Sequence, residues 1–271
     1  METNIVTGDG VRLFCRVKGE GEPIVMIHGA MVDADFYDGM QEILSARMKV
    51  VSYDRRGYSR SEKASDYSIE RQARDAAEII DSLCGGRAYV LGCSAGSLIA
   101  MKLAELYPEM VRHLYIHEAP AVYYDEILKE DEKIWLTDIY ETAVSGKISR
   151  AVIKFILGLP GAPGPDPRAK SYTTEAADRQ MRNSDIYMTY EYTEAFRLEP
   201  DYFDFERLKK TCQITGLAGD SSGDTYCVRA TRLVMDKLGG KMYYVPGRHN
   251  GARDLPGEFA SLLLGLTALE L

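Results

Sequence analysis

Short apolar runs alternate along the chain with longer segments that have helical periodicity. The runs are rich in Val, Ile and Tyr, are bounded by Gly, Pro or charged residues, and occupy positions 23–27, 49–53, 88–91, 113–117, 213–218 and 241–245. Runs of this kind are typical of strands that are buried on both faces of a parallel sheet. Two earlier segments, Asn4–Ile5 and Arg12–Val17, precede the first helical pattern, and we expect them to form an antiparallel edge.

The segments between the runs have the pattern of helices that cover one face of a sheet. Between residues 69 and 83 the apolar positions Ile69, Ala73, Ala76 and Ile80 fall on one stripe, with charged residues largely elsewhere. Residues 95–106 and 258–266 are similar. Strands that alternate with helices predict a mostly parallel α/β sheet with right-handed crossovers, flanked by helices.

This alternation stops between residues 122 and 206. Helical patterns at 125–145, 148–157 and 174–196 are separated there by a Pro-rich breaker at 159–167. The region holds eight of the 18 tyrosines and the sole tryptophan, Trp135. We interpret residues 122–206 as a helical cap inserted over the carboxyl edge of the sheet, and residues 1–121 and 207–271 as the core. The tyrosines are candidates to line a substrate pocket, although packing accounts for most of them.

Composition and charge narrow the classes of function. A chain of 271 residues with a net charge of −8 has room for one large domain, and its negative surface repels phosphate backbones and anionic lipid. We therefore expect no nucleic-acid partner and no membrane partner. No apolar stretch has the length of a membrane span, and the first residues lack the features of a signal peptide. Five cysteines without metal-type spacing predict a reduced, cytoplasmic protein with no metal site.

The most specific chemical motif is Gly92-Cys93-Ser94-Ala95-Gly96. It joins the apolar run 88–91 to the helical segment that begins near Ala95. Glycine at both ends removes side chains that would collide in a sharp strand-to-helix turn, and the turn lifts the Ser94 hydroxyl clear of the sheet. This motif is common by chance, but its strand–turn–helix context makes Ser94 a candidate nucleophile.

Other polar motifs follow the remaining runs in order. His28-Gly29-Ala30 follows the run 23–27 and offers a tight turn with a second backbone donor for an oxyanion. Asp54-Arg55-Arg56-Gly57-Tyr58-Ser59-Arg60-Ser61 follows the next run, and His249 lies in a glycine-bounded loop after the last one. A histidine in that loop is in a position to act as a general base toward Ser94.

This ordered set of motifs resembles the α/β-hydrolase superfamily, whose members share the His-Gly turn, the Asp-Arg-x-Gly-x-Ser-x-Ser segment, the serine elbow and a late histidine. The resemblance runs from about Gly8 to Leu271, and the insertion resembles that family's variable cap. It implies the α/β-hydrolase fold, with Ser94 as nucleophile and His249 as base. It also implies that the Ala30 and Ala95 amides form the oxyanion hole. Serine at the elbow argues against haloalkane dehalogenases and epoxide hydrolases, which carry aspartate there.

The acid of the catalytic triad is where the chain departs from the usual family pattern. Most members place an aspartate three residues beyond a glycine after the penultimate strand, and that position is Ser222 here. Asp224 lies two residues later. Glu118 ends the preceding run, where some members carry the acid before a proline and often have serine at the late position. A carboxylate at a buried strand end needs a partner such as His249 or Arg248. We favour Glu118 and keep Asp224 as the alternative.

These residues predict a carboxylesterase-like serine hydrolase. We expect it to cleave an ester or thioester of a small apolar or aromatic substrate through an acyl-enzyme, without a metal or an organic cofactor. One alternative is a cofactor-free lyase or oxygenase, or a C–C bond hydrolase, that uses His249 as its base. A non-catalytic ligand-binding protein is another. The only predicted partner is the small-molecule substrate, and the expected assembly is a monomer or a homodimer.

Overall fold

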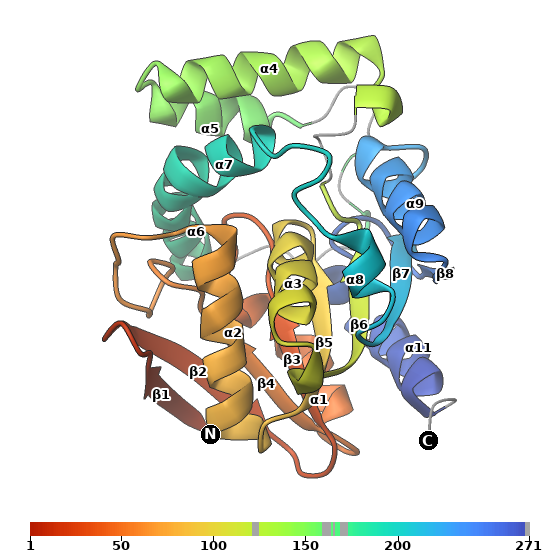
Figure 1. Ribbon diagram of the computed structural model, residues 1–271. Coiled ribbons are helices and arrows are strands. Elements are labelled where there is room, and N and C mark those ends of the chain that lie inside the picture. Colours follow the sequence, from red (N-terminus) through yellow and green to blue (C-terminus); the bar gives the residue numbers. More distant parts are fainter. Residues whose placement is uncertain (121–124, 159–163, 165, 169–172, 269–271) are drawn as a thin grey trace.

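One sheet forms the centre of the protein in a computed structural model that describes residues 1–120, 125–158, 164, 166–168 and 173–268 (Figure 1). Within these residues the sheet has eight strands in the order β1-β2-β4-β3-β5-β6-β7-β8. The strands are β1 (Glu2–Val6), β2 (Arg12–Lys18), β3 (Pro23–Ile27), β4 (Lys49–Tyr53), β5 (Ala88–Cys93), β6 (Val111–His117), β7 (Gln213–Gly219) and β8 (Lys241–Val245). β1 and β2 pair antiparallel at one edge, and β3 to β8 run parallel. The predicted sheet and its antiparallel edge are confirmed.

Helices cover both faces of the sheet. One face carries α2 (Ile69–Cys84), α3 (Ala95–Leu106), α8 (Phe205–Leu208) and α9 (Tyr226–Leu238), and the other carries α1 (Asp38–Leu44) and α11 (Pro256–Ala268). Successive strand residues point to opposite faces, so Val51 packs in the first apolar cluster and Val50 in the second. This burial on both faces explains why the strands appear as continuous apolar runs.

Helix α2 begins and ends where its sequence directs. The Ser68 side chain accepts a hydrogen bond from the Arg71 N–H at the first turn, and Gly85 ends the helix with a φ of 68°.

The sequence patterns predicted no helix at α1 or α9, nor at α10 (Gly251–Asp254). Two of these three are only four to seven residues long, which is too short for a clear periodic stripe.

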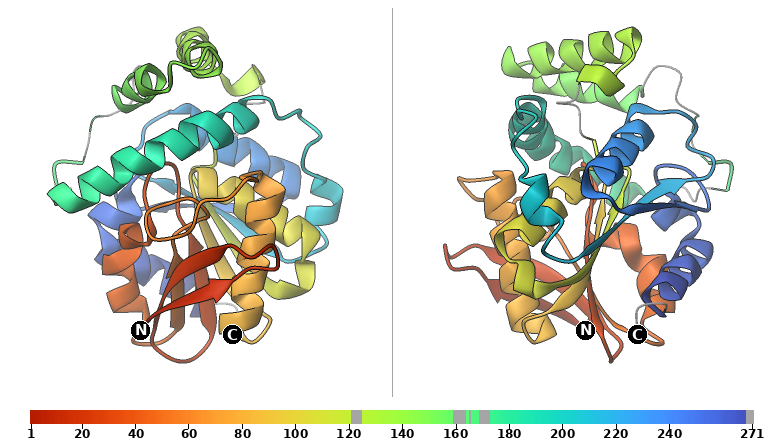
Figure 2. Two further views of the ribbon diagram at one scale, coloured as in Figure 1. Left: turned by 90° about the vertical axis from the view of Figure 1, so that its left-hand side faces the viewer. Right: turned by 45° about the vertical axis from the view of Figure 1, so that its right-hand side comes forward.

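The segment between β6 and β7 is helical and lies over the carboxyl ends of the strands (Figures 1 and 2). It contains α4 (Glu130–Val144), α5 (Ile148–Ile156), α6 (Thr174–Ile186), the π-helix η4 (Tyr187–Glu191) and α7 (Tyr192–Phe196). In both figures α4 and α5 form the outermost layer, above α6 and α7. The expected boundary at residue 206 falls inside α8. Tyr123, Tyr124, Tyr172 and most of the breaker at 159–167 lie outside the described residues.

These helices have their own apolar cluster, which also includes residues from outside the segment. Met31, Tyr58 and Tyr226 pack in it with aliphatic and aromatic side chains of α4 to α7. No helix in the described ranges combines the length and the apolar character that crossing a bilayer requires.

Candidate active site

The turn between β5 and α3 holds Ser94 in a strained conformation. Its φ is 52°, which a residue with a side chain adopts only where the surroundings hold it, and its N–H donates to the His117 carbonyl at 2.8 Å. The flanking glycines are required sterically. A Cβ on Gly92 would lie 2.6 Å from the Gly96 carbonyl oxygen, and a Cβ on Gly96 would overlap the Ile27 carbonyl oxygen. The predicted serine elbow is thus present as a strand–turn–helix unit.

The turn after β3 lies directly against Ser94. A Cβ on Gly29 would be 2.9 Å from the Ser94 Cβ and 3.6 Å from its Oγ, so only glycine allows this approach. Ala30 follows in the same turn. Ala95 begins α3, where backbone N–H groups have no partner within the helix and the helix dipole is positive. The two amides expected to form an oxyanion hole are therefore adjacent to the candidate nucleophile.

His249 and Glu118 meet at the same edge of the sheet although 131 residues separate them. His249 lies in the loop after β8, and Glu118 follows β6 with a φ of 47°. The distance from His249 Nδ1 to Glu118 Oε2 is 2.7 Å. Because an ionised carboxylate only accepts hydrogen bonds, Nδ1 is the donor and Nε2 carries the lone pair. This is the tautomer that a general base needs.

The carboxylate of Glu118 is buried and fully engaged. Its Oε1 accepts hydrogen bonds from the Gly219 N–H at 2.8 Å and the Ser222 hydroxyl at 2.5 Å, and its side chain is 1% exposed. Burial by itself raises the pKa of Glu118, but the hydrogen bonds and the charge of His249 lower it to about 2. Burial lowers the pKa of His249, and the hydrogen bond and charge of Glu118 raise it above its ordinary value.

Ser222 has a role that the sequence patterns did not reveal. It occupies the position where most family members carry the late aspartate, and its hydroxyl binds the carboxylate that lies beside His249. In the sequence, the spacing of Ser222 three residues after Gly219 identifies its position in the loop. That spacing does not indicate the hydrogen bond from its hydroxyl to Glu118.

The alternative acid, Asp224, lies elsewhere. Its side chain is 59% exposed and forms ion pairs with Lys129 at 3.1 Å and Arg229 at 3.2 Å. The structure brings Glu118, and not Asp224, within hydrogen-bond distance of His249. Within the described part of the chain, the Ser94 hydroxyl has no hydrogen-bond partner; such contacts in enzymes often tighten only when substrate binds.

Two other histidines near the site are buried and neutral. His28 Nδ1 contacts the Gly29 carbonyl at 3.0 Å, and its Nε2 accepts the Arg55 N–H at 3.2 Å. Burial and the charge of Arg55 lower the pKa of His28 to about 3. Burial likewise lowers the pKa of His117 to about 4. His28 therefore braces the turn after β3.

A narrow cavity of about 30 Å³ reaches Ala95 from the side of the helical segment. Its wall is mostly apolar and combines aliphatic residues of α2 and α3 with aromatic residues of η4, α7 and α9. The aromatic residues are Tyr187, Tyr192, Phe196 and Tyr226. Two of them belong to the tyrosines considered as pocket residues. Among the residues that the structure describes, no group of three His, Cys, Asp or Glu side chains is placed to hold a metal ion.

Comparison with known proteins adds independent support for the fold. A sequence model of the family described as the alpha/beta hydrolase fold matches residues 22–143. An uncharacterized hydrolase of Bacillus subtilis, YraK, is 28% identical over 262 residues, which cover 94% of this chain and 92% of that protein.

Solved structures share the architecture over nearly the whole chain. The esterase EaEST from Exiguobacterium antarcticum has a TM-score of 0.72 at 20% identity, and the alignment covers 98% of this chain and 99% of that one. Est816, described as an N-acyl homoserine lactone degrading enzyme, has a TM-score of 0.70 at 22% identity, covering 97% and 99%. The sheet order, the serine elbow and these matches agree. The chain therefore has the α/β-hydrolase fold, and its residues 22–143 are similar in sequence to the family of that name.

Proposed function

We propose that the protein is a serine hydrolase that cleaves a carboxylic ester or thioester of a small molecule through an acyl-enzyme. The observation that carries this proposal is the 2.7 Å hydrogen bond between Glu118 and His249, at the sheet edge that also presents Ser94. The fold alone hosts several chemistries, so the proposal rests on the site. Two proteins with similar structures, described as an esterase and an N-acyl homoserine lactone degrading enzyme, are compatible with it.

In the proposed reaction His249 Nε2 takes the proton of the Ser94 hydroxyl as Oγ attacks the acyl carbon. The Ala30 and Ala95 amides stabilise the oxyanion, each by roughly 3 kcal/mol in comparable sites. Glu118 keeps the ring oriented and stabilises the imidazolium. His249 then protonates the leaving alcohol or thiol. A water molecule that loses its proton to His249 attacks the acyl carbon, and Ser94 recovers its proton as the acid product leaves.

We further propose that residues 122–206 act as a cap over a core formed by residues 1–121 and 207–271. The apolar cluster that α4 to α7 share with Met31, Tyr58 and Tyr226 supports this division. The cavity beside Ala95 lies between the two parts and is lined mainly by apolar and aromatic groups. Such a wall fits a small apolar or aromatic part of the substrate.

Labelling with a fluorophosphonate tests the proposed function directly. We expect the folded protein to hydrolyse p-nitrophenyl acetate and to gain one phosphonyl group on Ser94, because the reagent needs a serine activated by a base. Intact-protein and peptide mass spectrometry measure the site and the stoichiometry. A folded protein that neither turns over the ester nor reacts with the reagent would contradict the proposal.

The size of the cavity predicts a preference for short acyl groups. We expect kcat/KM for p-nitrophenyl acetate or butyrate to exceed that for the decanoate by at least about tenfold, because methylenes that do not fit lose their binding energy. Phe196→Ala removes a ring from the cavity wall and should reduce the difference in kcat/KM between the short and the long esters. Phe155→Ala is the matched control, since Phe155 packs in the same cluster but does not line the cavity. Equal chain-length profiles for the two variants would show that the cavity does not hold the acyl group.

A further inference from the structure

The peptide that joins Gly29 to Ala30 is held on its carbonyl side by two buried side chains. Arg55 Nη2 donates to the Gly29 carbonyl at 3.0 Å, and His28 Nδ1 contacts the same oxygen at 3.0 Å. A trans peptide is planar, so its N–H points opposite to its C=O. Whatever orients the Gly29 carbonyl therefore orients the Ala30 N–H, which is a proposed oxyanion donor.

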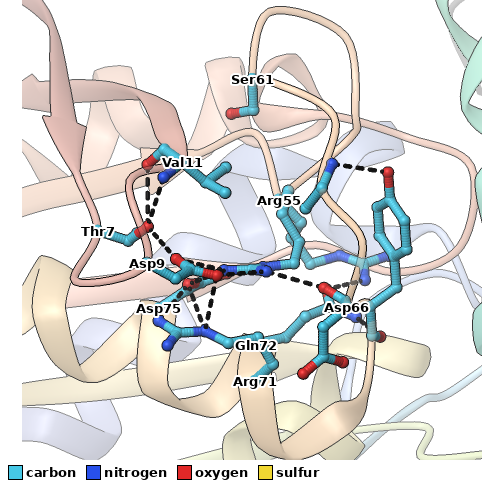
Figure 3. A network of polar contacts seen from close by, with 12 residues as sticks. Thr7, Asp9, Val11, Arg55, Ser61, Asp66, Arg71, Gln72 and Asp75 are labelled. Carbon is cyan, nitrogen blue, oxygen red and sulfur yellow. Dashed lines mark hydrogen bonds and ion pairs between the residues drawn. The ribbon is translucent and has the colours of Figure 1, made fainter.

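Arg55 takes its own position from the helical segment above the sheet. Its guanidinium is 1% exposed, and Nη1 donates to Glu191 Oε1 at 2.6 Å and to Gln72 Oε1 at 2.6 Å. Figure 3 shows Arg55 above Gln72 of α2. Glu191 ends the π-helix η4, is 6% exposed, and also accepts hydrogen bonds from the Tyr58 hydroxyl at 3.0 Å and from Gln72 Nε2 at 3.1 Å. A buried charge pair of this kind keeps its geometry because either partner alone would be an uncompensated charge.

The helical segment also holds the next residues of the same turn. Met31 has a φ of 64°, and the Val32 N–H donates to the Ala30 carbonyl at 2.8 Å, which forms a strained γ-turn. Asn183 of α6 donates from Nδ2 to the Met31 carbonyl at 3.0 Å and accepts the Ser59 N–H at 2.8 Å. Two residues of the segment that follows β6 therefore hold the turn beside Ser94: Asn183 directly, and Glu191 through Arg55.

We propose that Arg55 is a positioning residue for the oxyanion turn, and that Glu191, by holding Arg55, couples docking of the helical segment to the placement of the Ala30 amide. The contacts form one chain from Glu191 through Arg55 and the Gly29 carbonyl to the Ala30 N–H. The proposal rests on the proposed function, because it assigns the Ala30 amide to the acyl-transfer step.

A double substitution isolates this role. Arg55→Met with Glu191→Gln removes both charges together, so no buried charge is left unpaired, and glutamine keeps nearly the size of the glutamate that it replaces. We expect kcat for p-nitrophenyl acetate to fall about 10- to 100-fold and KM to change less than about threefold, because a misplaced donor weakens the transition state more than substrate binding.

The neighbouring residue supplies a matched control. Arg56 is also buried and pairs with Asp75 at 2.6 Å, but this pair joins α2 to the β1–β2 turn through Asp9, and Arg56 donates to Asp75, Asp9 and the Asp66 carbonyl rather than to Gly29. Figure 3 shows Asp9, Asp75 and Arg71 close together. Arg56→Met with Asp75→Asn should lower the melting temperature and leave kcat within about twofold.

An NMR experiment reads the peptide itself without relying on catalysis. Protein labelled with carbonyl-¹³C glycine and ¹⁵N alanine gives cross-peaks only for Gly–Ala pairs, and the chain has three: Gly29–Ala30, Gly161–Ala162 and Gly251–Ala252. Loss of the first peak in an Ala30→Val sample assigns it. We expect Arg55→Met/Glu191→Gln to shift this peak and leave the other two in place, and the Arg56 control to leave all three in place.

The outcomes separate this proposal from the proposed function. An unmoved Gly29–Ala30 peak, an unchanged kcat, or an equal loss of kcat in the Arg56 control would each overturn the role of Arg55. If the wild-type protein has no esterase activity and no fluorophosphonate adduct, the proposed function fails. The cross-peak then decides by itself whether Arg55 holds the peptide.

Discussion

Ser94→Ala should lower kcat for p-nitrophenyl acetate by about 10⁴- to 10⁶-fold, the largest effect we expect from any single substitution. Alanine keeps the fold of the elbow but has no oxygen to attack the acyl carbon. The loss corresponds to about 5 to 8 kcal/mol of transition-state stabilisation. The residual rate comes from the oxyanion amides and from binding alone. Steady-state kinetics, with active sites counted by fluorophosphonate titration of the wild type, measure the effect.

The control is Ser261→Ala, because Ser261 is an exposed serine of α11 whose hydroxyl donates to the Gly257 carbonyl of its own helix. This variant should keep wild-type kcat and the phosphonyl adduct on Ser94. Substantial activity in Ser94→Ala, such as a tenth of the wild-type value, would instead favour a lyase or oxygenase reaction in which His249 acts as base without a nucleophile.

Glu118→Gln should lower kcat by about 10³- to 10⁴-fold, and Asp224→Asn should change it less than about twofold. Glutamine has nearly the size of glutamate, but its amide has no charge to stabilise an imidazolium. It can also donate to Nδ1, which favours the tautomer with the wrong lone pair. Asp224 has no such contact, since it pairs at the surface with Lys129 and Arg229. A large loss in Asp224→Asn with full activity in Glu118→Gln would reverse this assignment of the acid.

Glu118→Gln should also change the pH dependence of kcat/KM. The neutral form of His249 is the base, so kcat/KM rises with pH as the ring loses its proton. Glu118 raises the pKa of His249, so the midpoint of this rise in the wild-type profile should lie above the ordinary histidine pKa of 6.5. Glu118 itself, with a pKa of about 2, stays ionised through this range. In Glu118→Gln the charge that raises the pKa of His249 is absent, so the rise in kcat/KM should move to lower pH. Profiles of kcat/KM from about pH 5 to pH 9 measure the shift.

Local sequence was sufficient for the parts of the fold that depend on neighbouring residues. The strands followed from runs such as 23–27 because burial on both faces requires continuous apolar side chains. The elbow at Ser94 followed from its two glycines, since the steric limits of a sharp turn are local. No helix was predicted at α9, although Val228, Val234, Met235 and Leu238 lie at helical spacing on its buried face.

The sequence by itself thus determined the α/β architecture, the position of Ser94 and the order of the polar motifs, because each depends on residues close together in the chain. Only the tertiary structure decided which carboxylate lies beside His249. It also showed the contact of Ser222 with Glu118 and the pairing of Arg55 with Glu191. These contacts join residues 104 to 136 positions apart, so they depend on strand order and on how the helical segment lies over the sheet. Periodicity reports which face of an element is buried, but not which distant side chain shares that burial.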